Sequence, residues 1–241
     1  MTGDARTLAE ARRRLRATAN EEIAAFLQRF FRTGPGGYGE GDRFLGVRVP
    51  VVRRIARECR ALRHADVVRL LRSQWHEERL LALVILADRY GRADPDERER
   101  IFRTYLAHTH RINNWDLVDV SAPHIVGAHL DPRDLTLLTR LARSASVWER
   151  RIAILATFHW IRKGDIEPTL RIARLLVGDP HDLIHKAVGW MLREAAKRDR
   201  DAVEAFLRRH HAGMPRTMLR YAVERFPPAL RRKFVPSRSA A

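Results

Sequence analysis

The stretch "ERLLALVILADRYG" at residues 78–91 decides the fold, because its apolar residues recur at the three- and four-residue spacing of one helix face. Its opening "ERLLAL" is followed by "NWDLVD" at 114–119, "ERRIAI" at 149–154 and "LIHKAV" at 183–188, so that successive segments start 36, 35 and 34 residues apart. Each opens the second helix of a pair, after a first helix expected at 65–72, 96–107, 133–143 or 167–177. A two-helix unit with this period predicts an all-α fold, an α-solenoid of antiparallel HEAT-like helix pairs. Such arrays curve, so we expect the second helices to line a basic concave face.

The helix pattern predicts a single HEAT-like repeat domain over residues 1–235, followed by a disordered tail at 236–241. Three segments, "RADPDERER", "HLDPRDL" and "VGDPHDL", set an acid and a proline at an expected helix start. The segment "TGPGGYGEGDR" at 33–43 interrupts the pattern, and its glycines predict a loop. It lacks the strand–loop–helix context of a nucleotide cradle, so a phosphate-binding P-loop is not expected.

The chain is strongly basic, with a formal net charge of +17 and a pI near 11.3. Only four of its 46 basic residues are lysines, and arginine guanidinium groups match phosphate oxygens in pairs. Genome base composition is an alternative reason for the ratio of arginine to lysine, but it does not account for the net charge. We therefore expect a polyanionic partner, nucleic acid before membrane.

Several classes of protein are disfavoured by the composition. No apolar stretch approaches the roughly 20 residues that cross a bilayer, and the first residues do not form a secretory or transit signal. The single cysteine, Cys59, allows no internal disulfide and fits a reducing compartment. We expect a cytoplasmic, nucleoid-associated monomer.

The stretch "INNWDLVDVSAPHIVG" at 112–127 carries two acids among core-type residues. If Asn113 is the N-cap, Asp116 lies in the first turn, where capping and the helix dipole explain it. Asp119 lies one turn beyond, four residues after Trp115 and on the same face. It is either a solvated acid or a carboxylate that holds a cation beside an indole.

Further candidates lie in later second helices. In "HKAVGWMLREAAK", Gly189 stands inside a strong helix directly before Trp190, so close approach of a backbone or ligand is expected to offset its cost of about 1 kcal/mol. "WERRIAIL" presents Arg150 and Arg151 about 100° apart, one as a phosphate contact and the other as a partner for a carboxylate. The scattered histidines and the lone cysteine predict no metal site.

Four motifs, "NNWDLVDVSAPHIVG", "WERRIAIL", "HKAVGWMLREAAK" and "MPRTMLRYAVERFP", resemble the DNA alkylation repair family of the AlkD type, HEAT-like repeat DNA glycosylases. The resemblance runs from "FLGVRVP" at 44–50 to "RFPP" at 225–228. It places the family's functional residues at Trp115, Asp119, Arg151 and Trp190. Asp116 matches an intervening acid of the family, in agreement with the capping interpretation.

The resemblance implies hydrolysis of the N-glycosidic bond of cationic alkylated purines, such as 3-methyladenine and 7-methylguanine, in double-stranded DNA. A carboxylate would stabilise the deoxyribose cation as the bond breaks, and indole faces attract the same charge. No metal or cofactor is implied, because the alkylated base is already a good leaving group. Active relatives carry a helical segment before "FLG" with an aromatic residue near the substrate. Here the glycine-rich loop takes that position, with Tyr38 as the nearest equivalent.

Two alternatives remain from the residues themselves. A non-catalytic protein that recognises bent, damaged or branched DNA would follow if the glycine-rich loop removes a helix from the binding cleft. A protein-binding scaffold is typical of helical solenoids, although the high positive charge disfavours it. Tyr38 and Arg150 are expected to contact DNA. For phosphate contacts we expect basic residues near the second helices or the matched motifs: Arg48, Arg54, Lys186 and Arg216.

Overall fold

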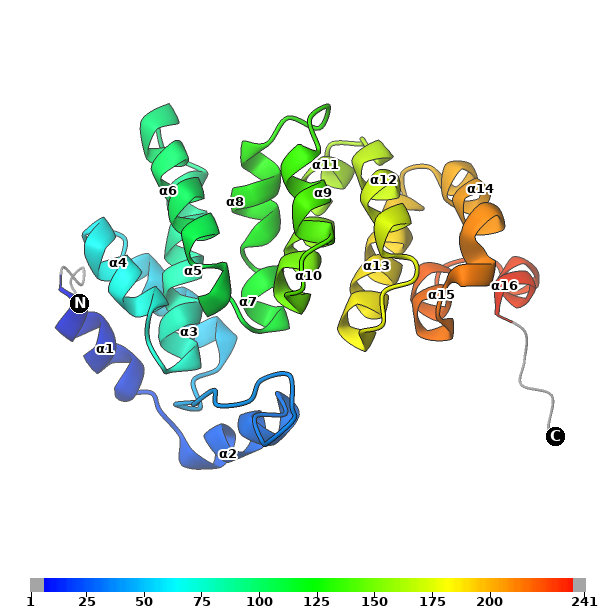
Figure 1. Cartoon of the computed structure of the whole chain (residues 1–241). Coiled ribbons are helices and arrows are strands. Elements are labelled where there is room, and N and C mark those ends of the chain that lie inside the picture. The colour runs from blue at the N-terminus through cyan, green and yellow to red at the C-terminus, as the bar shows by residue number, and fades with distance from the viewer. Residues whose placement is uncertain (1–6, 236–241) are drawn as a thin grey trace. The chain divides into compact units, whose positions relative to one another are not determined.

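The computed structural model describes residues 7–235, and the predicted tail at 236–241 lies outside them (Figure 1). This part of the chain is all-helical, as predicted, and contains no strand beyond an isolated bridge between Arg43 and Trp75. None of its helices has the length and apolar character needed to cross a membrane. The chain divides into two compact units, Met1–Ile125 and Val126–Ala241, and each is described by itself. The single domain over 1–235 and the basic concave face stay predictions.

The first unit contains two of the predicted helix pairs in part. The first helix expected at 65–72 is found as α4 and the one at 96–107 as α6, and α5 packs against α3 and α4. The helices of this unit are α1 (Leu8–Arg16), α2 (Glu21–Phe30), α3 (Val49–Glu58), α4 (His64–Leu71), α5 (His76–Tyr90), α6 (Pro95–Ala107), the 3-10 turn η1 (Thr109–Arg111) and α7 (Trp115–Asp119).

The second unit repeats the pairing. Second helices α10, α13 and α15 pack in succession, and first helices α9, α12 and α14 follow one another beside them (Figure 1). After α8 (Ala122–His129), which begins in the first unit, the helices are α9 (Thr136–Ala142), α10 (Val147–Ala156), α11 (Phe158–Arg162), α12 (Glu167–Leu176), α13 (Asp182–Ala195), α14 (Arg200–His210), the 3-10 turn η2 (His211–Gly213), α15 (Arg216–Ala222) and α16 (Pro228–Phe234).

Asp-Pro dipeptides begin helices less often than predicted. At α6, Asp94 is the N-cap and its carboxylate accepts a hydrogen bond from Glu97 N at 2.8 Å, with Pro95 as the first helical residue. The other two dipeptides lie in the turns before α9 and α13. At α9 the helix starts at Thr136, whose N–H donates to the Asp134 carboxylate at 3.0 Å. The dipeptide therefore marks the approach to a helix rather than its first residue.

The long helix α5 forms the centre of the first unit. All residues from His76 to Leu83 are buried, including four consecutive charged or ionisable ones. Buried charges need partners. Glu78 accepts hydrogen bonds from Arg12 and Arg16 at 3.0 and 3.1 Å, which ties α1 to α5. The charged start of α5 therefore orients the elements around it.

Gly189 has the structural role that the sequence analysis expected. A Cβ atom at this position would lie 2.5 Å from Met218 O and 2.5 Å from Tyr221 Cβ. Because α13 packs directly on α15 here, only glycine leaves room for the second backbone. The close approach is made by protein, and it offsets the cost of a glycine inside a helix.

Candidate functional site

A pocket of about 450 Å³ in the first unit brings together several of the predicted site residues. Trp115 and Asp119 line it from α7, and Arg48 lines it from the start of α3. Its walls are largely apolar. The other lining residues are Ile23, Phe26, Leu27, Phe30 and Phe31 from α2 and its end, Phe44, Val47, Val49 and Pro50 from the "FLGVRVP" segment, His76, Glu77 and Leu80 from α5, and Asp116 and Val120.

Helix α2 supplies an aromatic wall. None of its residues is buried, and Phe26 and Phe30 remain 55% and 53% exposed. The centroid of the Phe30 ring lies 5.9 Å from that of Phe26 and 6.1 Å from that of Trp115, which it meets edge-on. Phe31 stacks on Trp115 at 5.2 Å. The apolar face of α2 therefore opens into the pocket instead of packing into the core.

The glycine-rich loop fixes Trp115. The Trp115 indole N–H donates to the Tyr38 hydroxyl oxygen at 3.3 Å, and the Tyr38 hydroxyl donates to Phe30 O at 3.2 Å. The loop turns tightly back on α2, since a Cβ at Gly39 would lie 2.5 Å from Phe31 O. Tyr38 thus lies beside the aromatic wall, but it is not the main aromatic residue there. Helix α2, which lies directly before the loop, lines the pocket, so a helix borders this site beside the loop.

Asp119 is the last residue of α7 and is half-buried at the pocket. The helix ends there because Pro123 lacks the N–H that would otherwise bond to the Asp119 carbonyl. The Asp119 charge acts on the buried Tyr105, whose hydroxyl lies 3.1 Å from Ser121 Oγ. Burial raises the pKa of Tyr105 above its usual value, and the nearby Asp119 carboxylate raises it further. Asp119 therefore places a negative charge between the apolar pocket and the core.

Asp116 is more than the helix-start acid that the sequence suggested. The N-cap of α7 is Asn114, not Asn113, because the Asn114 carboxamide oxygen accepts from Trp115 N at 2.8 Å. Asp116 Oδ1 accepts from Leu117 N, while its Oδ2 lies 2.8 Å from His76 Nε2. Asp116 therefore serves as an ion-pair partner as well as a first-turn acid.

His76 is held as a cation between two carboxylates. Its other ring nitrogen, Nδ1, lies 3.4 Å from Asp42 Oδ2, and its ring stacks on Phe44 at 4.4 Å. Burial by itself lowers the pKa of His76, but the charge and hydrogen bond of Asp116 and the hydrogen bond of Asp42 outweigh it and raise the pKa to about 9. The imidazolium therefore ties α5 to α7 at neutral pH.

The other carboxylate of this network is itself shared. Asp42 Oδ1 accepts from Arg79 at 2.7 Å and from Asn113 Nδ2 at 3.1 Å. Burial raises the pKa of Asp42, but its hydrogen bond with His76 and the Arg79 charge more than offset this and hold the pKa below its usual value. The network thus connects the glycine-rich loop to α5 and α7.

Glu77 holds the backbone that leads into α3. The residue is only 1% exposed. Its carboxylate accepts hydrogen bonds from the N–H groups of Leu45, Gly46 and Val47, at 2.8, 2.8 and 3.1 Å. Three donors satisfy a buried carboxylate and fix the segment that carries Phe44 and Arg48 into the pocket wall.

The remaining predicted site residues occupy varied environments. In the first unit, Arg48 and Arg54 are exposed at and within α3. In the second unit, Arg151 is 5% exposed and donates to Leu183 O at 2.7 Å. Trp190 is half-buried, and its ring centroid lies 5.8 Å from that of Phe158. Arg150 donates to Asp179 at 2.6 Å, and Lys186 pairs with Asp182 at 2.6 Å. Arg216 lies at the start of α15 and is exposed.

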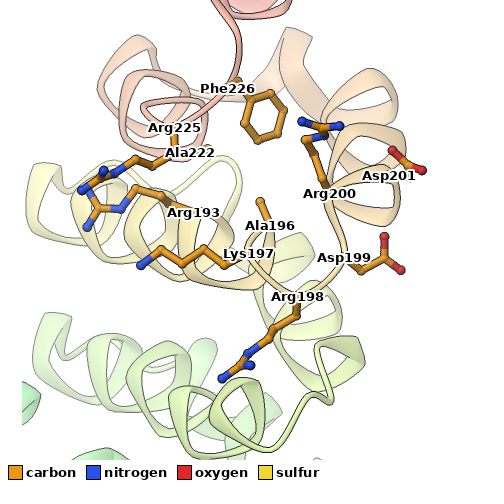
Figure 2. A pocket seen from close by; sticks show the side chains of 10 residues that line it. All are labelled: Arg193, Ala196, Lys197, Arg198, Asp199, Arg200, Asp201, Ala222, Arg225 and Phe226. Atoms are coloured by element: carbon orange, nitrogen blue, oxygen red, sulfur yellow. The ribbon is translucent and has the colours of Figure 1, made fainter.

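A separate pocket of about 520 Å³ in the second unit contains none of the predicted residues (Figure 2). It lies between the ends of α13 and α15 and the start of α14. Two of its five basic side chains are paired with acids, since Arg193 pairs with Glu224 and Lys197 Nζ lies 2.6 Å from Glu194 Oε2. Within residues 7–235, no cluster of three or more histidine, cysteine or acidic residues is arranged to hold a metal ion.

Sequence reasoning missed Phe26, Phe30, His76 and Glu77. The two phenylalanines did carry a signal, because "EEIAAFLQRFF" places Ile23, Phe26 and Phe30 on one helix face. The partners of His76 and Glu77 lie 30 to 40 positions away, so nothing local identifies them.

Known proteins with a similar sequence pattern or fold identify the family of this chain. The family described as DNA alkylation repair enzyme matches residues 11–226. A predicted DNA alkylation repair enzyme from Enterococcus faecalis has a similar fold, with a TM-score of 0.65, 16% identity, and coverage of 88% of this chain and 98% of that one. AlkD2 from Streptococcus mutans gives a TM-score of 0.54 at 16% identity, covering 90% of this chain and 99% of its own. No curated protein matches the chain. Since the family match spans most of its length, the chain belongs to the DNA alkylation repair enzyme family.

Proposed function

We propose that this protein binds double-stranded DNA and hydrolyses the N-glycosidic bond of cationic alkylated purines, among them 3-methyladenine and 7-methylguanine. The observation that carries the proposal is the pocket that combines the Asp119 carboxylate with Trp115 and the exposed rings of Phe26 and Phe30. A negative charge beside aromatic faces suits a planar cation or a cationic sugar.

The reaction breaks the bond between deoxyribose C1′ and the purine nitrogen. The bonding electron pair leaves with the alkylated base, which thereby loses its positive charge. C1′ becomes cationic, a water molecule adds to it, and the water gives up a proton. In this scheme the Asp119 carboxylate stabilises the C1′ cation and orients the water.

We assign this role to Asp119 on the resemblance, which matches Asp116 to an intervening acid of the family. The Asp116 carboxylate is engaged at 2.8 Å by His76, whose raised pKa of about 9 keeps it cationic at neutral pH. A carboxylate already balanced by a buried cation stabilises a second cation less. Asp116 and His76 act in this account as positioning residues for α7.

The other residues receive supporting roles. Trp115, fixed by Tyr38, adds its indole ring beside the aromatic wall of α2. Arg48, exposed at the pocket, and Arg54 contact phosphates. For residues of the second unit the assignments are predictions from the resemblance or from their charge: Arg151 and Trp190 in the reaction, and Arg150, Lys186 and Arg216 in phosphate binding.

The test is base release from methylated DNA, resolved by chromatography, with wild-type protein, Asp119→Asn and the control Asp96→Asn. Asp96 is an exposed acid in the first turn of α6, so its substitution makes the same chemical change away from the pocket. Release of methylated purines by the wild type and the control, but not by Asp119→Asn, supports the proposal. Duplex binding without base release by any of the three proteins would instead support the non-catalytic DNA-binding alternative.

A further inference from the structure

The first helices α12 and α14 of the second unit enclose a groove of about 330 Å³. Its floor is apolar, and its rim is basic. Leu170, Ala202, Ala205 and Phe206 form the floor, and Arg171, Arg174, Arg209, His210 and Glu167 complete the lining.

The three groove arginines, Arg171, Arg174 and Arg209, are all exposed. In the part of the chain that the structure describes, none of them makes a salt bridge or a side-chain hydrogen bond. Their neighbour Arg208 on α14, in contrast, pairs with Glu204. Glu167 is the one acid that lines the groove, so the groove carries an excess of positive charge.

Charges from both helices converge on His210. Its ring lies 4.6 Å from the Phe206 ring, at the groove floor. Burial lowers the pKa of His210, and the positive charges of Arg209 and Arg174 lower it further. The basic groups of α12 and α14 therefore repel one another, and a bound anion would relieve that repulsion.

This arrangement differs from the pocket in Figure 2. There, Asp199 and Asp201 lie among the basic residues, and Glu194 and Glu224 pair with two of them. The α12–α14 groove has no comparable set of acids. Arginine guanidinium groups bind phosphate oxygens in a bidentate manner, and an apolar floor suits the sugar faces between phosphates.

We propose that the α12–α14 groove is a nucleic-acid contact surface that holds the phosphates of a second DNA segment. The groove lies on the first helices, whereas Arg150, Lys186 and Arg216 lie on the second helices α10, α13 and α15. The second unit thus presents basic groups on both of its helix rows. A protein with two such surfaces brings two duplexes together even when neither carries an alkylated base.

A capture assay tests this surface. The protein is bound to a bead-immobilised, undamaged duplex, and retention of a second, fluorescent duplex is measured. We expect wild-type protein to retain the second duplex. The double variant Arg174→Ala/Arg209→Ala should retain at least about tenfold less of it, while its affinity for the first duplex stays within about threefold of the wild-type value. The matched control is Arg231→Ala/Arg232→Ala, which removes the same charge from exposed positions on α16.

A second readout reports on the groove itself. A phosphate beside His210 should raise the pKa of its imidazole, measured by NMR titration of the ring proton with and without duplex. Absence of capture by the wild type, equal capture by the groove variant, or equal loss in the control would overturn the proposal. Because undamaged DNA is used, failure of base release leaves this test unaffected.

Discussion

His76 Nε2 lies 2.8 Å from Asp116 Oδ2, and this ion pair joins α5 to α7, the short helix that carries Trp115 and Asp119. Helix α7 has only five residues, and a helix of this length is not stable by itself. Its position therefore depends on contacts such as the His76–Asp116 pair. The orientation of Trp115 and Asp119 at the pocket depends in turn on α7.

The His76 pair predicts that stability falls at alkaline pH. The pKa of His76 is about 9 in the folded protein and 6.5 as the ordinary value, so its contribution is fully present below pH 6.5 and is lost as pH rises through 9. The free energy of unfolding should decrease by up to about 3 kcal/mol over this range. Urea unfolding at several pH values measures it. In His76→Gln this slope should largely disappear, and an unchanged slope would contradict the assignment.

The hydrogen bonds of Glu77 predict that the protein loses stability when this carboxylate is changed to an amide. Glu77→Gln replaces one of the two carboxylate oxygens by an NH2 group, so at least one of the three backbone N–H groups loses its acceptor and faces a donor. The substitution should destabilise the protein by about 3 kcal/mol. Glu22→Gln changes an exposed acid in the first turn of α2 and should cost less than about 0.5 kcal/mol. Chemical denaturation of both variants gives the comparison. Equal effects would show that the carboxylate does not hold the "FLGVRVP" backbone.

The exposed rings of α2 predict a loss of function without a large loss of stability. Phe26→Ala/Phe30→Ala removes rings that are more than half exposed, so the free energy of unfolding should fall by no more than about 2 kcal/mol. Excision at low substrate concentration should drop roughly 10-fold or more if these rings contact the substrate. Leu175→Ala, another exposed apolar residue, is the control. Unchanged excision by the double variant would remove α2 from the proposed site.

Gly189 predicts an effect opposite to ordinary helix propensity. Gly189→Ala places a methyl group 2.5 Å from Met218 O and should destabilise the protein by about 1–3 kcal/mol, although alanine is the better helix former. At Gly178 no atom lies within 4 Å of an added Cβ, so Gly178→Ala should be neutral or slightly stabilising. Thermal unfolding of the two variants checks the prediction. A neutral Gly189→Ala would show that α13 and α15 can separate without cost.

The helical periodicity predicted much of the fold. The first helices expected at 65–72, 96–107 and 167–177 are found within two residues as α4, α6 and α12. The boundary of α9 was less well predicted, because the helix starts at Thr136, whose N–H donates to Asp134, and not at the expected residue 133. Local spacing identifies helices well, whereas their ends depend on individual hydrogen bonds.

The site was only partly predictable. The resemblance and the four-residue spacing indicated Trp115 and Asp119, and both line the pocket. The ion-pair role of Asp116 was not predicted, because its partner, His76, lies 40 positions earlier. The aromatic wall was not predicted, because the aromatic contribution was expected from Tyr38 in the glycine-rich loop rather than from the helix before it. Pairings between distant residues form only when the helices pack.

The central claim is tested most directly by single-turnover excision on a duplex that contains one 7-methylguanine, with affinity measured in parallel. We predict that Asp119→Asn lowers the excision rate by at least about 100-fold, as expected for loss of a transition-state charge partner, while duplex affinity stays within about threefold. An excision rate in Asp119→Asn equal to that of the wild type would contradict the account, because the carboxylate would then have no part in breaking the glycosidic bond.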